Sequence, residues 1–238
     1  MKKIVSLFLG IVMIFGCGTS VFALDIPQAS YEETPQQQIE AAILSIDEVA
    51  LQRDALNNVV DRSVPASIRD GFHFESEITV DDPTYENPFE IGEVYSTVQR
   101  VGEINYANGE VGVMYVATAA TEIKEDYGYG SKLGAKAWTT VYWIDNLGTT
   151  NELYAVDATW DTSNCSYQTS NKIIQYGKVV LSTGVFTSST TVEVADSVTS
   201  KYINCHGEYT GLSFACMSQI NVGPSPVKIN CWAFTSLA

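Results

Sequence analysis

Hydrophobic and polar residues alternate in short runs through the second half of the chain, as they do in β-strands. Two such runs, residues 94–107 and 110–123, meet at Asn108-Gly109, a dipeptide typical of tight hairpin turns. Further runs rich in β-branched and aromatic residues follow as far as residue 236, with turn-forming residues between them. Strands spaced in this way predict a mainly β fold, an antiparallel β-sandwich or barrel-like domain over residues 94–238.

A helical periodicity precedes the β region. Between about residues 35 and 62, apolar side chains recur every three or four positions, which predicts one amphipathic α-helix. Thr34 and Gln37 form a capping box, Pro35 suits the first helical position, and Pro65 disfavours continuation of the helix. We expect the apolar stripe of this helix to pack on the β domain. The alternative is a pro-segment or a helix that binds a partner.

The stretch WTTVYWIDNLGTTNELYAVDATW contains three of the four tryptophans. Folded as a hairpin that pairs Trp138 with Trp160, it places an almost wholly apolar set of side chains on one face, which we expect to be core. The opposite face then carries Trp143 together with Asp145 and Asp157. An indole can stack on a sugar ring while carboxylates beside it accept hydrogen bonds from the sugar hydroxyls. These three residues are therefore the predicted ligand-binding residues, with burial of Trp143 as the alternative.

The N-terminus has the pattern of an export signal. A basic start, an apolar run over residues 4–15 and a small-residue motif that ends at Ala23 predict a signal peptide over residues 1–23, which resembles those of Gram-positive bacteria. We expect a secreted, extracellular product. Processing as a lipoprotein at Cys17 is the alternative, and it would leave a lipid anchor. No later apolar stretch has the length of a membrane span.

The charge of the chain narrows the choice of partners. The sequence has 28 acidic and 13 basic residues, a net charge of −15, and the acidic excess is concentrated before the β domain, in residues 24–93. Because the sequence supplies no basic patch, nucleic acids and anionic lipid surfaces are disfavoured as partners of the protein. Residues 74–93 hold seven acids and no base, but their spacing does not match a calcium-binding loop. We interpret them as a solvated acidic segment and predict no metal site.

Four cysteines follow the predicted cleavage site. An even number of cysteines in an exported chain predicts disulfides, here between Cys165, Cys205, Cys216 and Cys231. The turn-forming residues 223–226 favour a hairpin that pairs Cys216 with Cys231, which leaves Cys165 for Cys205. No Cys-x-x-Cys pair or histidine cluster indicates a metal or another cofactor.

Residue types suited to catalysis are scarce. The only histidines are His73 and His206, and no nucleophile or metal-protease motif is present. We therefore predict no catalytic residues and a non-enzymatic extracellular binding protein, whose partner is a glycan or a protein at a surface. One alternative is a secreted glycoside hydrolase that uses two carboxylates, with Glu152, Asp157 and Asp161 as candidates. Another is a secreted toxin or antimicrobial protein with an acidic pro-segment.

Overall fold

The computed structural model describes residues 33–71, 74–80, 89–126, 130–146, 150–180, 183–223 and 227–236. One compact unit runs from Glu33 to Ala238. The predicted signal peptide, Cys17, His73 and much of the acidic segment lie outside the described residues.

Three short helices precede eleven strands. The helices are α1 (Pro35–Leu44), α2 (Glu48–Leu56) and α3 (Ala66–Asp70). The strands are β1 (Phe74–Val80), β2 (Phe89–Ile91), β3 (Tyr95–Asn105), β4 (Val111–Asp126), β5 (Ser131–Asp145), β6 (Asn151–Asp161), β7 (Thr169–Val179), β8 (Phe186–Val194), β9 (Ser200–Gly211), β10 (Ser213–Val222) and β11 (Val227–Ser236). None of the helices in the described part of the chain is both long and apolar enough to cross a membrane.

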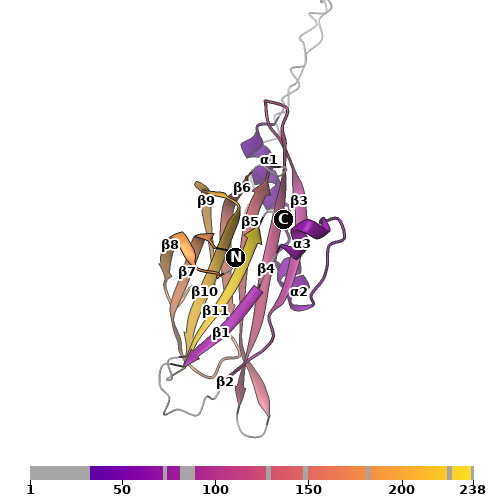
Figure 1. Ribbon diagram of the computed structural model, residues 1–238. Coiled ribbons are helices and arrows are strands. Elements are labelled where there is room, and N and C mark those ends of the chain that lie inside the picture. Colours follow the sequence, from indigo (N-terminus) through magenta and orange to yellow (C-terminus); the bar gives the residue numbers. More distant parts are fainter. Residues whose placement is uncertain are drawn as a thin grey trace, which may run out of the picture. The chain divides into compact units, whose positions relative to one another are not determined.

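The strands form two antiparallel sheets, as predicted (Figure 1). Sheet A has the order β2-β4-β5-β6-β9. Strand β3 pairs with the same side of β4 as β2 does, but with an earlier part of β4. Sheet B has the order β1-β11-β10-β7-β8. The hairpin predicted at Asn108-Gly109 joins β3 to β4, and Gly109 has a φ of 84°, a left-handed conformation that favours glycine. Strand β1, which comes from the acidic region, pairs with β11 and belongs to the sandwich.

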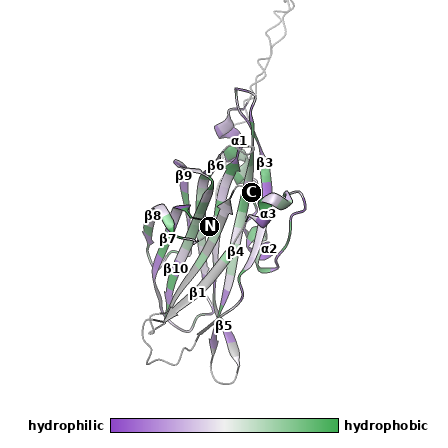
Figure 2. Cartoon of the chain, viewed as in Figure 1, coloured by the Kyte–Doolittle hydropathy of each residue, from purple (hydrophilic) through white to green (hydrophobic). Residues whose placement is uncertain are grey.

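The main core lies between the two sheets. Sheet A contributes Trp143, Val156 and Trp160, and sheet B contributes Ile174 and Phe214, all at most 1% exposed. Figure 2 shows β10, in the middle of sheet B, coloured mainly as hydrophobic. One polar link crosses this core, between the buried hydroxyls of Thr139 and Ser218, 2.6 Å apart. This hydrogen bond satisfies both groups, which would otherwise be costly to bury.

Helices α1 and α2 cover the other face of sheet A, where they contact β3 and, for α2, also β4 (Figure 1). Ile39 and Leu51 are each 3% exposed and join a second core with Met114, Tyr142 and other residues of the sheet. The central strands of sheet A are therefore buried on both faces. The predicted packing of a helical apolar stripe on the β domain is confirmed.

The predicted single helix over residues 35–62 is wrong in one respect, because the structure divides it. Helix α1 ends at Leu44, and the hydroxyl of Ser45, which caps it, donates to the carbonyl of Ala42 at 2.6 Å. Asp47 then caps α2 by accepting from the amide of Ala50 at 3.0 Å. Short polar side chains that bond to the nearby backbone compete with a continuous helix, which explains the break. Helix α2 ends before residue 57, ahead of Asn58, which has a φ of 49°.

The β5–β6 hairpin forms, but its predicted register is wrong. Trp138 pairs with Thr159, and Trp160 pairs with Ala137. Towards the turn, the pairing lies two residues from the prediction, which keeps the predicted faces. The change of face comes from a bulge at Tyr154, since its two neighbours in β6 pair with adjacent residues of β5. One extra residue moves every later side chain of the strand to the other face.

The predicted disulfides are absent, and all four cysteines are free thiols in the described part of the chain. The β10–β11 hairpin is present, with residues 224–226 outside the described residues. Its register pairs Cys216 with Ala233 and Cys231 with Ser218, so the two cysteines are diagonal neighbours. Diagonal neighbours lie about 7–8 Å apart, whereas disulfides usually join Cα atoms about 4.4–6.8 Å apart.

Candidate functional site

The structure does not bring the three predicted ligand-binding residues together. Trp143 is 1% exposed and stacks on Tyr115 in the core between the sheets, with ring centroids 5.3 Å apart. Asp145 ends β5 and is 9% exposed. Asp157 faces the opposite side of sheet A, in register with Thr140 and Tyr202. An indole so completely buried has no surface for a ligand, and the alternative, a core position for Trp143, is correct.

Asp157 is a carboxylate whose pKa is raised by its surroundings. It is partly buried on the face of sheet A that carries the helices, and it accepts from the hydroxyl of Thr159 at 3.2 Å. Burial, and to a smaller extent the negative charge of Glu48 in α2, raise the pKa of Asp157 to about 6 from its ordinary value of 3.8. A carboxyl group with this pKa exchanges its proton near neutral pH, as general acids and pH-dependent binding groups do.

Two tyrosines border Asp157. Tyr202 of β9 is 39% exposed, and its ring meets that of the buried Tyr142 edge-on, with centroids 5.8 Å apart. Burial is the largest effect that raises the pKa of Tyr202, to about 12, and the negative charges of Asp157 and Glu48 contribute. The Tyr202 hydroxyl therefore stays protonated at physiological pH and can donate a hydrogen bond. We call Glu48, Tyr142, Asp157 and Tyr202 the Asp157 cluster.

A histidine–carboxylate pair adjoins the cluster. Nε2 of His206 lies 3.0 Å from Oε1 of Glu152, and the His206 ring packs against Tyr154 at a centroid distance of 5.1 Å. The pairing of β6 with β9 is interrupted at residues 205–208, opposite Tyr154, and His206 belongs to this irregular stretch. From α1, Gln36 donates to the Tyr154 hydroxyl at 3.2 Å. The outer face of β6 and β9 thus combines exposed rings with carboxylates.

The other carboxylate candidates have separate surroundings. Glu152 belongs to the pair with His206. Asp161 accepts from the backbone and the hydroxyl of Ser163 in the turn after β6, at 3.0 and 2.7 Å. Within the described residues, no group of three or more histidine, cysteine or acidic side chains is placed to hold a metal ion.

Sequence reasoning singled out Asp157 but did not identify its neighbours Tyr202 and Glu48. The alternation of Tyr202, Asn204 and His206 in the sequence was a usable signal, because alternate residues of a strand share a face. The pairing of β9 with β6 and the position of α2 arise only in the tertiary structure.

The chain matches no protein-family model, and comparisons with curated proteins and with solved structures found no match either.

Proposed function

We propose that the protein is a secreted, extracellular binding module that recognises a glycan through the Asp157 cluster. The observation that carries this proposal is the partly exposed ring of Tyr202, held edge-on by Tyr142 beside the carboxylate of Asp157. Its extracellular location rests on the signal peptide predicted from residues 1–23.

The chemistry of the Asp157 cluster suits a sugar ring. The apolar face of a sugar can cover the Tyr202 ring, while its hydroxyls donate to Asp157 or Glu48. Because Tyr142 already fixes the Tyr202 ring, less side-chain freedom is lost when a ligand binds. The net charge of −15 favours neutral or amino sugars over sulfated or uronic acid sugars.

A glycan array tests the proposal. We expect the purified protein to bind a subset of neutral or amino-sugar glycans, and Tyr202→Ala to weaken this binding by about tenfold or more, the loss expected when a central aromatic contact is removed. Leu212→Ala is the matched control, because Leu212 is 62% exposed and lies outside the cluster. Binding that Tyr202→Ala leaves unchanged would exclude this surface, and an array without any signal would exclude glycans as the ligand.

One observation favours a second function, glycoside hydrolysis. The raised pKa of Asp157 suits a general acid, and the Glu48 carboxylate that contributes to this pKa would be its partner. If the protein cleaves a glycan that it binds, Asp157→Asn should abolish the release of reducing ends even at glycan concentrations at which the variant is still bound. Hydrolysis that persists in Asp157→Asn would refute this role, and an absence of hydrolysis in the wild type leaves the binding function alone.

A further inference from the structure

A pocket of about 210 Å³ lies where the edges of the two sheets meet, away from the Asp157 cluster. Strand β1 is an edge of sheet B, and β3 lies on an edge of sheet A. Phe74 comes from β1, Arg69 from α3, and Ser96, Thr97 and Val98 from β3. The remaining lining residues are Val59 and Val60.

The segment before α3 fixes one wall of the pocket. Val60 forms a parallel bridge with Val98, and the carbonyl of Val59 accepts from the Thr97 hydroxyl at 2.7 Å. Asn58 accepts from the backbone amide of Ser96 at 2.8 Å. These contacts satisfy the outer edge of β3, so the wall is formed before any ligand arrives.

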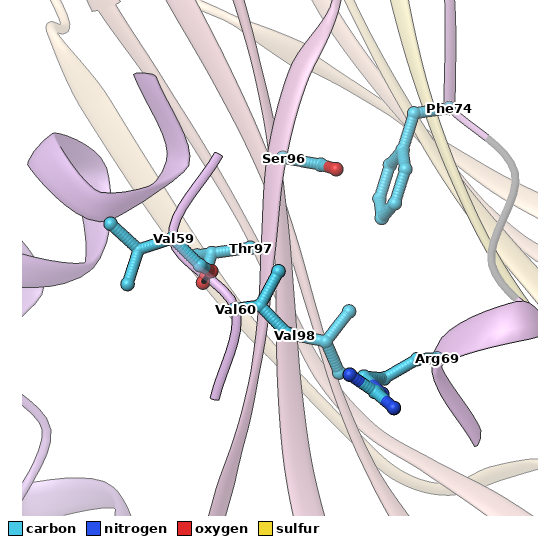
Figure 3. A pocket seen from close by; sticks show the side chains of 7 residues that line it. All are labelled: Val59, Val60, Arg69, Phe74, Ser96, Thr97 and Val98. Carbon is cyan, nitrogen blue, oxygen red and sulfur yellow. Dashed lines mark hydrogen bonds between the residues drawn. The ribbon is translucent and has the colours of Figure 1, made fainter. Parts of the chain in front are cut away.

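The lining is apolar except for two groups that are available to a ligand. Neither the guanidinium of Arg69 nor the hydroxyl of Ser96 has a hydrogen bond or ion pair with the residues that the structure describes. In Figure 3 the Ser96 and Phe74 side chains lie in the upper part of the view, and the Arg69 side chain lies below them and reaches towards Val98. Val59 and Val60 remain 42% and 57% exposed, an apolar surface that the described residues leave partly uncovered.

The lining selects a class of ligand. A guanidinium binds a carboxylate through two parallel hydrogen bonds, and the valines and Phe74 accept an apolar group. Among the described residues, no acidic side chain lines the pocket, so the ammonium group of a free amino acid would lack a partner there. The volume of about 210 Å³ is below the range of sites for drug-sized molecules and suits a small ligand.

We propose that this pocket binds a carboxylate attached to a small branched or aromatic apolar group, with the carboxylate on Arg69 and the apolar group against Phe74 and Val98. A free short-chain acid and the C-terminal residue of a peptide both present this chemistry. The site is separate from the Asp157 cluster, so its failure or success is independent of the glycan proposal.

Titrations followed by the backbone amide resonances of the purified protein test this site. The probes are 4-methylpentanoate for a free acid and acetyl-leucine for a peptide terminus, each compared with its uncharged amide. We expect saturable shifts at Ser96 and Val98 with at least one acid, and binding weaker by about tenfold or more for the matching amide, because a charge-assisted hydrogen bond is lost. Preference for one of the two acids identifies the source of the ligand.

Arg69→Gln should weaken acid binding by about tenfold or more without changing the thermal unfolding midpoint, because Arg69 is exposed and has no ion pair to lose among the described residues. Arg62→Gln is the matched control, since Arg62 is also exposed but does not line the pocket. Three results would overturn the proposal: equal affinity for acid and amide, unchanged binding in Arg69→Gln, or no saturable shift with either acid.

Discussion

Trp138 and Trp160 lie on opposite faces of sheet A. Trp138 packs beside Ala55 and Leu56 of α2, and its indole N–H donates to the carbonyl of Gln52 at 3.2 Å. Trp160 belongs to the core between the sheets. The indoles of this hairpin therefore fix sheet A to the helices on one side and to sheet B on the other.

The burial of Trp143 predicts a large effect on stability. Trp143→Ala should lower the free energy of unfolding by about 3–5 kcal/mol, the usual cost of truncating a buried tryptophan. It also removes the stack on Tyr115. Urea unfolding followed by circular dichroism measures the change, and Leu212→Ala, at an exposed position, should stay within about 0.5 kcal/mol of the wild type. A Trp143→Ala protein as stable as the wild type would contradict the placement of this indole in the core.

Lys172 makes a second testable contribution to the core. Its side chain is 2% exposed, and its Nζ donates to the carbonyls of Asp196 and Val198, at 2.8 and 2.6 Å. The same ammonium lies 5.4 Å from the centroid of the Trp160 ring, within the range of a cation–π interaction. Lys172 thus joins β7 to the turn between β8 and β9.

Replacement of Lys172 by methionine has two opposing effects. It removes the desolvation cost of a buried charge, but it also removes two charge-assisted hydrogen bonds and the contact with Trp160. Water can reach the exposed turn around Asp196 and can partly replace the lost hydrogen bonds. We therefore expect the free energy of unfolding to fall by only about 1–3 kcal/mol. Urea unfolding measures it, and faster amide exchange at residues 196–199 should accompany it. Lys201→Met, at an exposed position, is the control, and an equal effect of the two substitutions would argue against the proposed role of Lys172.

Local sequence signals predicted the elements of this fold better than their pairing. The alternation of residues predicted the strands, and Asn108-Gly109 predicted the hairpin between β3 and β4, because both signals depend on neighbours in the sequence. The bulge at Tyr154 has no comparable signal. It moved Trp160 and the neighbouring apolar side chains of β6 onto the face of Trp143, and this face packs against sheet B as core.

The candidate site could be predicted only in part. Asp157 was identified because it lies close in sequence to several aromatic residues. Its raised pKa depends on burial and on Glu48, more than a hundred residues earlier in the chain, which α2 brings near it. Such long-range contacts follow from the packing of α2 on sheet A, and no periodicity in the sequence encodes them.

The pKa of Asp157 makes the stability of the protein depend on pH. Because its pKa is about 6 in the folded protein against an ordinary value of 3.8, the folded state binds the proton more tightly than the unfolded chain does. The stabilisation from this proton is fully present below the ordinary value and is lost as the pH rises through about 6. A shift of this size corresponds to a contribution on the order of 3 kcal/mol.

Asp157→Asn should therefore stabilise the protein at neutral pH, since an amide carries no charge to desolvate beside Glu48. Urea unfolding between pH 4 and pH 8 measures the difference from the wild type, which should be small at the acidic end, grow in favour of the variant as the pH rises towards about 6, and level off above it. Asp161→Asn is a control of opposite sign. The hydroxyl and backbone amide of Ser163 lower the pKa of Asp161, so its loss should destabilise the protein at neutral pH. A constant difference between Asp157→Asn and the wild type across this range would show that Asp157 does not titrate as its burial implies.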